Sequence, residues 1–274
     1  MIFDIDHPEV IDVVKRALDE DIGTGDVTTD SCVPPGLAAE GFFTARTPMV
    51  AAGVELLKLI FDDVTLLKKS GDSAADGDVL ATVRGDARTL LTRERVSLNF
   101  LQRLSGVATL ARAYFDAVAG TGCTILDTRK TTPGLRRLEK MAAAAGGATN
   151  HRMGLFDAVL IKNNHIILAG GIRAAVEGAR NSGLPIELEV RTHDEIEEAL
   201  SLGVKHLLFD NMTPRQAAGE IRFVAGRAKV ELSGGINLTT VREYAETGAD
   251  FISVGAITHS ATAVDINLRI HLCR

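Results

Sequence analysis

Short apolar runs alternate with helix-like segments through the second half of the chain, and this alternation restricts the possible folds more than any other feature. The runs are CTILDT (123–128), AVLIKN (158–163), IELEV (186–190), HLLFDN (206–211), KVELSGG (229–235) and DFISVG (250–255). Several intervening segments open with Thr or Asn and close at Gly, as capped helices do. Such alternation predicts βα units and a parallel sheet, and six units favour a barrel or partial barrel over an open sheet.

The first half of the chain has a different pattern. Residues 8–20 carry apolar side chains at helical spacing, with Pro8 in the first turn, and residues 91–119 also follow a helical pattern. Residues 21–30, rich in Gly, Asp and Thr, are expected to form a loop. Between these segments, residues 40–90 mix short alternating apolar runs with Gly-Asp turns, which predicts a small sheet-containing domain.

Composition and charge narrow the functional classes. The 274 residues are 46% hydrophobic and 24% charged, as in soluble globular proteins, and the net charge is −6. This acidity argues against nucleic acid and against anionic membrane surfaces as partners, and no apolar stretch is long enough to span a membrane. Three widely spaced cysteines and an N-terminus without the pattern of a signal peptide predict a reduced, cytoplasmic protein.

Polar side chains gather where the predicted strands of the second half end. In a β/α barrel the carboxyl ends of the strands meet on one rim, and the working residues come from there. The strand ends carry Asp127, Thr128, Arg129 and Lys130, then Lys162, Asn163, Asn164 and His165, then Glu189, Asp210 and Asn211, and finally Ser233, Gly234, Gly235, Gly255 and Ala256. Six polar strand ends together predict an active site on this rim.

Positive charge is concentrated between Asp127 and His165. Seven lysines and arginines stand there against three carboxylates, and five of these cations lie in TRKTTPGLRRLEK (128–140). This local excess suits an anionic substrate, with Arg129 and Lys130 as the main functional candidates. Arg137 and Lys140 are expected on the solvated face of a helix that a threonine caps. Lys162 lies in an apolar strand, where an unpaired ammonium is costly, so it is either functional or paired with Glu189.

Two further groups of residues suit a phosphorylated ligand. Glu189 and Asp210 end neighbouring strands and could hold Mg²⁺, or they could pair with Lys130 and Lys162 instead. Ser233-Gly234-Gly235 and Gly255-Ala256 follow the last two strands, the usual phosphate-binding position of a barrel.

Nine longer stretches occur in an order typical of one enzyme family. They are EDIGTGDVTTD, LNFLQRLSGVAT, TRKTTPGLRRLEK, GGATNHRMGL, LIKNNH, ELEV, FDNM, ELSGGINL and FISVGAITHS. In these stretches the chain resembles the quinolinate phosphoribosyltransferase family (nicotinate-nucleotide pyrophosphorylase, carboxylating), and the resemblance covers nearly the whole chain.

The resemblance implies an α/β fold with an N-terminal α/β sandwich domain (1–105, joined by residues 262–274) and a C-terminal, incomplete TIM-like barrel (106–261). It implies that quinolinate and phosphoribosyl pyrophosphate give nicotinate mononucleotide, pyrophosphate and CO₂ with Mg²⁺, in NAD biosynthesis. It also implies a homodimer, or a higher homo-oligomer, whose active sites are shared between subunits.

The resemblance also implies roles for single residues. Quinolinate carboxylates would be held by Arg129, His151, Arg152 and Lys162, with Arg95 reaching in from the partner subunit, and Thr128 would also bind substrate. Lys130, Glu189 and Asp210 would serve the ribose, the pyrophosphate and the metal, and together with Lys162 they would be the catalytic residues. The 5′-phosphate would lie against Ser233, Gly234, Gly235, Gly255, Ala256 and His259.

The chain departs from the family pattern at two positions. Three other interpretations compete with the phosphoribosyltransferase. Asn163 stands where the family pattern has Asp, which leaves the local partner of Lys162 open, and Phe209 stands where Leu is usual. The molybdenum-transport-associated paralogue of the same fold lacks the Lys and Asn-His of LIKNNH, so their presence here favours the transferase. A Schiff-base aldolase using Lys162 is the second competing interpretation, and a non-catalytic phosphate-binding module is the third.

Overall fold

The structure is a computed structural model that describes residues 3–273. Its contacts divide the chain into two compact units. The first comprises Met1–Arg112, Thr131–Gly147 and Ile257–Arg274, and the second Ala113–Lys130 and Ala148–Ala256. These units follow packing, and the domain boundaries 105/106 and 261/262 stay a prediction. Among the described residues, no helix has the length and apolar character needed to cross a membrane.

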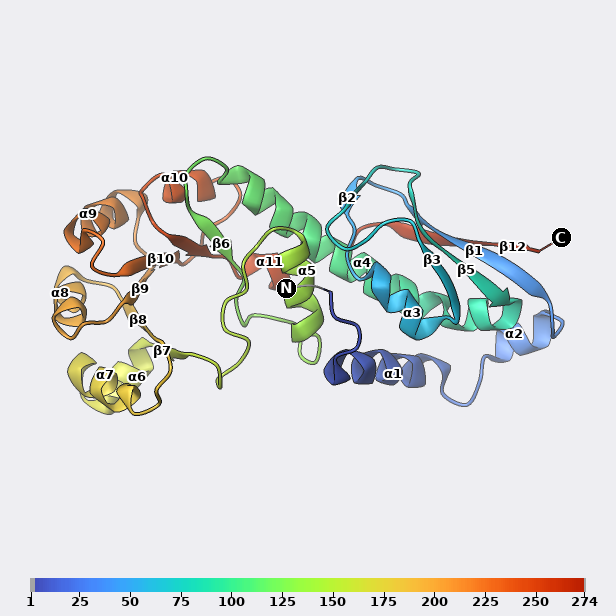
Figure 1. Cartoon of the computed structure of the whole chain (residues 1–274), viewed down its shortest axis with the longest axis horizontal. Helices are drawn as coiled ribbons and strands as arrows, with labels where there is room; N and C mark the ends of the chain where they lie inside the picture. Colours follow the sequence, from blue (N-terminus) through green and yellow to red (C-terminus); the bar gives the residue numbers. More distant parts are fainter. Residues whose placement is uncertain (1–2, 274) are drawn as a thin grey trace. The chain divides into compact units, whose positions relative to one another are not determined.

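The first unit is built on a four-stranded antiparallel sheet (Figure 1). Its order is β12 (Ile266–Leu272), β1 (Ala38–Ala45), β5 (Val79–Asp86) and β3 (Asp63–Leu66). Burial alternates along β1, with Phe43 and Ala45 in the core, as expected of a sheet with one covered face. A short pair, β2 (Met49–Val50) and β4 (Ser73–Ala74), completes the sheet-forming segment that the sequence predicted between residues 40 and 90.

The helices of the first unit include the two that the sequence predicted. Helix α1 has Pro8 at its start, and the predicted helix at 91–119 is part of a single 31-residue helix, α4. The last residues of α4 are counted with the second unit. The full set is α1 (Pro8–Ile22), α2 (Val27–Cys32), the 3-10 turn η1 (Val54–Leu56), α3 (Leu57–Ile60), α4 (Ala87–Ala117), α5 (Arg136–Ala145) and α11 (Ala256–His259), whose first residue belongs to the second unit.

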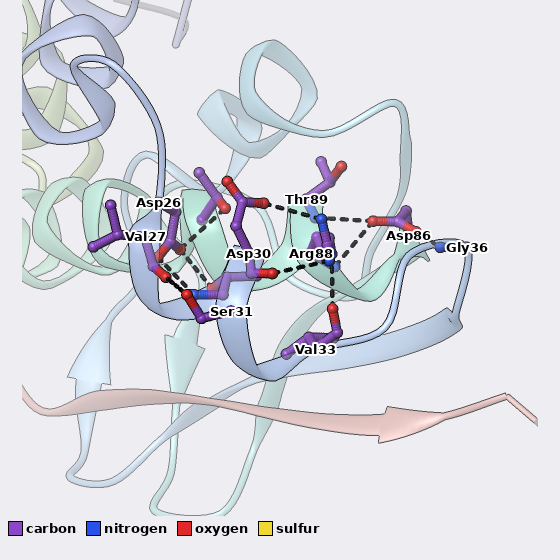
Figure 2. Close-up of polar contacts among 11 residues, drawn as sticks. Asp26, Val27, Asp30, Ser31, Val33, Gly36, Asp86, Arg88 and Thr89 are labelled. Atoms are coloured by element: carbon purple, nitrogen blue, oxygen red, sulfur yellow. Dashed lines mark hydrogen bonds and ion pairs between the residues drawn. The ribbon is translucent and has the colours of Figure 1, made fainter.

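The loop predicted for residues 21–30 is wrong at both ends, because helix α1 continues to Ile22 and helix α2 begins at Val27. The side chain of Asp26 caps α2 by accepting the Thr29 N–H at 2.9 Å. Arg88 of α4 then donates to the Asp30 carboxylate at 3.1 Å and to the Val33 carbonyl at 2.9 Å (Figure 2). A six-residue helix is not stable by itself, so the cap and these tertiary contacts are what form it.

The expectation that Arg137 and Lys140 lie on a solvated face of helix α5 is wrong for Lys140. Lys140 is fully buried, and so are the residues on either side of it from Leu138 to Ala143. A helix with six successive buried residues is covered on all sides, which its local sequence does not reveal. Arg137 keeps a partly exposed side chain and pairs with Glu9 at 2.7 Å.

The threonine cap predicted for α5 is also wrong. Leu135 is the N-cap residue and makes no side-chain capping bond. Thr132 instead donates its N–H and its hydroxyl to the carboxylate of Glu139, at 3.0 and 2.7 Å. The glutamate in the first turn therefore organises the preceding loop, in place of the expected threonine.

The second unit is a six-stranded parallel sheet, as the sequence predicted (Figure 1). Its order is β6 (Thr124–Leu126), β11 (Phe251–Ser253), β10 (Lys229–Ser233), β9 (His206–Asp210), β8 (Ile186–Val190) and β7 (Val159–Ile161). The first strand of the unit lies beside the last, which is the order of a barrel. In the residues described, β6 and β7 do not pair, so the barrel is incomplete.

A short segment follows the free edge of β6. Thr149 forms a parallel bridge with Leu126, and its N–H donates to the Ile125 carbonyl at 2.8 Å. The N–H of Asp127 donates back to the Thr149 carbonyl at 3.1 Å. The chain that leads to His151 is thus fixed at the open edge of the sheet.

Helices connect the successive strands of this unit. They are α6 (Asn163–Ala169), α7 (Ile172–Arg180), α8 (His193–Ser201), α9 (Pro214–Val224) and α10 (Val241–Ala245). Predicted threonine caps are confirmed at α8 and α9, where Thr192 and Thr213 accept the N–H groups of Glu195 and Gln216.

Candidate active site

A pocket of about 440 Å³ opens at the carboxyl ends of the parallel strands. Its lining residues are Thr128, Arg129, Lys130, His151, Arg152, Leu155, Leu160, Lys162, His165, Leu208, Glu231, Ser233 and Ser253. All of them belong to the second unit. The first unit has a hollow of its own, of about 350 Å³, along α1 and α4, and that hollow contains none of the predicted site residues.

The pocket brings together seven of the residues predicted to bind substrate. These are Thr128, Arg129, Lys130, His151, Arg152, Lys162 and Ser233, contributed by the ends of β6, β7 and β10 and by the segment along β6. Four of the seven are permanent cations at physiological pH. The wall is therefore strongly positive although the protein as a whole is acidic.

Two guanidinium groups repel one another in this wall. Burial of Arg152, together with the charge of Arg129 beside it, lowers the pKa of Arg152, while the carboxylates of Glu187 and Asp157 oppose the shift. The Arg152 side chain is also held by the Ala158 carbonyl, 3.0 Å from Nη1. Two neighbouring like charges are unfavourable until an anion lies between them, so this part of the pocket is prepared for a carboxylate or a phosphate.

Lys162 lies just beyond the strand in which the sequence placed it. Strand β7 ends at Ile161, and Lys162 is the exposed N-cap residue of α6. Within residues 3–273, no ion pair joins Lys162 to Glu189, the pairing that its sequence position suggested. Asn163, the residue that departs from the family pattern, accepts a hydrogen bond from Arg191 at 2.8 Å.

Glu189 and Asp210 stand at the ends of the adjacent strands β8 and β9, and both are half-buried. One oxygen of Glu189 accepts the Asn163 N–H at 3.3 Å. One oxygen of Asp210 accepts from the Asn211 side chain at 2.8 Å. Each carboxylate keeps a second oxygen outside these bonds, and carboxylate oxygens are the donors that Mg²⁺ prefers.

The glycines after β10 allow a close approach of backbone segments. At Gly234, with φ of +106°, a Cβ would lie 2.2 Å from Oδ1 of Asn211. The Asn211 N–H in turn donates to the Ser233 carbonyl at 2.9 Å. Only glycine fits this position. The turns after β9 and β10 therefore pack closely and are joined by this hydrogen bond. Gly235 follows directly, and Gly255 and Ala256 follow the next strand of the sheet, β11.

Two predicted residues belong to the first unit and not to the unit that lines the pocket. Arg95 is an exposed residue of α4. His259 ends the short helix α11, where its Nδ1 lies 2.6 Å from the Ser260 hydroxyl. Their roles toward a substrate stay predictions.

The sequence interpretation missed three ionisable residues in or near the pocket, Glu187, His206 and Glu231. Nε2 of His151 lies 3.0 Å from Glu187 and 3.6 Å from Glu231, and Nε2 of His206 lies 3.3 Å from Glu231 and 3.9 Å from Glu187. The side chains of Glu187 and Glu231 are 8% and 0% exposed. Ligand atoms of His151, Glu187 and Glu231 all lie within 4.8 Å of one another.

The histidines control the ionisation of this cluster. Burial alone would raise the pKa of Glu187, but the hydrogen bond from His151 and the charge of His206 lower it overall. Burial alone would likewise lower the pKa of His206, but its contact with Glu231 and the charges of both glutamates raise it. The lowered pKa favours an ionised Glu187 carboxylate inside the sheet.

One sequence signal could have revealed these residues. Glu187 and Glu189 are two residues apart in the apolar strand IELEV, so their side chains point to the same side of the sheet. Glu231 is similarly placed inside the apolar strand KVELS. An acidic residue inside a buried parallel strand is rarely structural filler and needs a partner.

Sequence profiles match both halves of the chain. The profile of the quinolinate phosphoribosyl transferase C-terminal domain matches residues 107–269, and that of the N-terminal domain matches residues 26–105. Together they cover most of the 274 residues.

Individual proteins resemble the chain over nearly its full length. The nicotinate-nucleotide pyrophosphorylase (carboxylating) of Mycobacterium leprae is 40% identical over 282 residues, covering 98% of this chain and 99% of its own. The chloroplastic protein of that name from Arabidopsis thaliana is 40% identical, covering 94% of this chain and 82% of its own. The crystal structure of NadC from Streptococcus pyogenes superposes with a TM-score of 0.91 at 36% identity, covering 98% of this chain and 97% of its own.

Proposed function

Because the chain belongs to the quinolinate phosphoribosyl transferase family, we propose that it converts quinolinate and phosphoribosyl pyrophosphate into nicotinate mononucleotide, pyrophosphate and CO₂. This reaction serves NAD biosynthesis. The observation that carries the proposal is the pocket itself, where Arg129, Lys130, Arg152 and Lys162 converge at the strand ends of a family member. Both substrates are polyanions, and an acidic protein needs such a local cationic wall to bind them.

Quinolinate would bind through its two carboxylates. Arg129 and Arg152 repel one another in the free protein, and a carboxylate between them relieves that repulsion. Lys162 supplies a third positive charge from the end of β7, and the hydroxyl of Thr128, at the end of β6, adds a polar contact. A dicarboxylate is thereby distinguished from a monocarboxylate, which would leave part of this wall unneutralised.

Phosphoribosyl pyrophosphate would occupy the opposite part of the rim. Lys130 faces the pocket, and Ser233 together with Gly234 and Gly235 would contact the 5′-phosphate from the end of β10. Gly255, Ala256 and His259 are assigned to the same phosphate by family resemblance, and α11 begins at Ala256.

Mg²⁺ is proposed as the metal, with Glu189 and Asp210 as its protein carboxylates. The fit rests on their chemistry, since both are ionisable oxygen donors on adjacent strands, each with an oxygen outside the bonds described above. When bound, Mg²⁺ would supply positive charge to the pyrophosphate group.

The reaction itself needs positioning and charge from these residues, and no covalent enzyme intermediate. The ring nitrogen of quinolinate attacks the ribose carbon as the bond to pyrophosphate breaks. The resulting pyridinium accepts the electron pair left when the 2-carboxylate departs as CO₂, and a proton then takes its place. The cationic wall holds both anions in contact through these steps.

A homodimer with shared sites is proposed from the family resemblance and from the location of Arg95. This exposed arginine lies on α4 of the first unit, whereas the pocket is lined by the second unit. An Arg95→Ala protein mixed with a Lys162→Ala protein should recover activity in verified mixed dimers, because one site then has both side chains. Absence of recovery would count against sharing.

Cytoplasmic location is a further proposal, supported by three cysteines that are all free thiols. Some plant relatives carry chloroplastic or mitochondrial names, which describe those proteins.

Turnover of quinolinate tests the function directly. Release of CO₂ and pyrophosphate should depend on both quinolinate and phosphoribosyl pyrophosphate, with nicotinate as the control substrate. Preference for nicotinate would overturn the substrate assignment, and borohydride trapping of a carbonyl compound on Lys162 would favour an aldolase.

A further inference from the structure

His151 and Arg152 sit on a backbone segment that is held from several directions. The Asp127 carboxylate, which is fully buried, accepts the His151 N–H at 2.8 Å and the Asn150 side chain at 2.6 Å. Thr149 is bridged to Leu126 of β6. The backbone up to His151 is therefore fixed by β6, and the open question is what fixes Arg152.

The imidazole of His151 provides that link, because both of its nitrogens are engaged. Nδ1 accepts the backbone N–H of Arg152 at 2.7 Å, and Nε2 faces the Glu187 carboxylate at 3.0 Å. A nitrogen that accepts an N–H carries no proton of its own, so the proton of the ring is on Nε2 and is donated to Glu187. His151 is thus a neutral imidazole of a single tautomer.

This tautomer excludes a metal-binding role for His151. A metal at Nε2 would need that nitrogen unprotonated and the proton on Nδ1, where it would point at the Arg152 N–H. Glu187, the His151 ring and the Arg152 N–H accordingly form a hydrogen-bond relay, and the group of His151, Glu187 and Glu231 is not a metal site.

We propose that Glu187 is a positioning residue that acts through His151 to fix Arg152 for binding of the quinolinate carboxylate. The inference rests on the proposed function. Arg152 is then held at two points, its backbone N–H by the His151 ring and its guanidinium by the Ala158 carbonyl. Without the Glu187 acceptor, the His151 ring can rotate and the Arg152 backbone loses its acceptor, although no residue that touches substrate has been changed.

The neighbouring groups do not compete for the hydrogen bond between His151 and Glu187. Glu231 lies 3.6 Å from Nε2 of His151, beyond hydrogen-bond distance, and is closer to His206 at 3.3 Å. His206 faces both glutamates and supplies their counter-charge, and its ring packs on Phe251 with centroids 5.5 Å apart. Glu187 is therefore the acceptor of the His151 proton.

The test compares two changes at one residue. Glu187→Gln keeps an oxygen that can accept the Nε2–H, and its KM for quinolinate should stay close to that of the unchanged protein. Glu187→Leu removes the acceptor and should raise the KM for quinolinate by about 10²-fold, the scale for a misplaced binding group. The KM for phosphoribosyl pyrophosphate should change much less. Equal KM values for quinolinate in the Leu and Gln variants would overturn the proposal.

A matched Glu–His pair on the outside of the same unit provides the control. Glu220 lies 2.8 Å from Nδ1 of His193, and neither lines the pocket. Glu220→Leu should leave both KM values unchanged. A rise in the quinolinate KM of this variant equal to that of Glu187→Leu would attribute the effect to general loosening and overturn the proposal.

A second measurement does not depend on turnover. The ¹⁵N chemical shifts of the His151 ring in the full chain should show a protonated Nε2 and an unprotonated Nδ1, and Glu187→Leu should change this pattern while Glu187→Gln preserves it. A doubly protonated ring, or the Nδ1–H tautomer, would overturn the relay even in an active enzyme. If the unchanged protein shows the expected ring but does not turn over quinolinate, the proposed function fails and the relay stands.

Discussion

Two buried carboxylates, one in each unit, differ in the hydrogen bonds that they accept. Glu139 of the first unit accepts Nε and Nη2 of Arg103 at 3.0 and 2.7 Å, and it also accepts the N–H and hydroxyl of Thr132 at 3.0 and 2.7 Å. Glu231 of the second unit is equally buried, yet within the described chain neither of its oxygens has a hydrogen-bond partner. Two histidine nitrogens, at 3.3 and 3.6 Å, face it instead.

The difference separates a structural charge from a functional one. A buried carboxylate that accepts hydrogen bonds from four donors is satisfied, and it holds those donors in place. A buried carboxylate with unfilled oxygens costs free energy, so a chain selected for stability alone would lose it. Its place at the base of the cationic pocket indicates that it is retained for the chemistry there.

The largest effect on stability is expected at Glu139. Glu139→Ala leaves the Arg103 guanidinium and the Thr132 donors without their acceptor, and should lower the free energy of unfolding by about 3–5 kcal/mol. Glu231→Gln removes a charge whose oxygens accept no hydrogen bond among the described residues but also takes away part of the counter-charge of His206, and it should lower the same quantity by only about 1 kcal/mol. Urea unfolding of both variants measures this. Equal decreases in the free energy of unfolding would show that the two carboxylates contribute equally to stability and would contradict the distinction.

Arg129→Ala should show the opposite result, with reduced activity and an almost unchanged free energy of unfolding. Loss of one preorganised electrostatic contact should reduce kcat/KM for quinolinate by about 10²–10³-fold. The free energy of unfolding should change by less than about 1 kcal/mol, because removal of Arg129 also relieves the repulsion of Arg152. Steady-state kinetics and urea unfolding on one preparation check both. Near-normal turnover would refute the role of Arg129 in binding a carboxylate.

The same comparison shows which parts of the molecule could be predicted from the sequence. The six parallel strands and the caps at Thr192 and Thr213 depend on patterns within a few residues, and these were predicted correctly. Helix α2 was missed because six residues carry too little periodicity, and the Asp26 cap and Arg88 contacts that form it are partly remote in sequence. Burial of Lys140 depends on neighbours on every side of α5, which no local pattern records.

The candidate site divides in a similar way. Arg129, Lys130, Lys162 and Ser233 were found because strand ends can be located from the sequence and share one rim. Glu187, His206 and Glu231 were missed because a short apolar strand does not show which of its faces is the interior. The engagement of both His151 nitrogens depends on a segment crossing the edge of β6, and only the folded chain brings Glu187 to that ring.

Two glycines extend the comparison of the units to backbone packing. In the first unit, a Cβ on Gly106 of α4 would lie 2.1 Å from the Thr262 carbonyl, whereas a Cβ on Gly178 of α7 in the second would meet nothing within 4 Å. Gly106→Ala should therefore lower the free energy of unfolding by about 1–3 kcal/mol, the cost of overpacking. Gly178→Ala should raise it by about 0.5–1 kcal/mol, because alanine favours the helix. Thermal and urea unfolding distinguish the two, and a loss at both positions would contradict open space at Gly178.

The smallest expected effect is a pH dependence that only the second unit should show. The pKa of His206 is raised, so its protonated form contributes stability that is fully present below its ordinary value of about 6.5 and is lost as the pH rises through the raised value. The pair of Arg103 and Glu139 in the first unit contains no histidine, so no such dependence is expected from it in this pH range. His206→Gln should consequently be destabilised most at low pH, with the difference from the unchanged protein shrinking as the pH rises above about 6.5. Urea midpoints across that range would show it, and a constant difference would mean that the charge of His206 does not support the two glutamates.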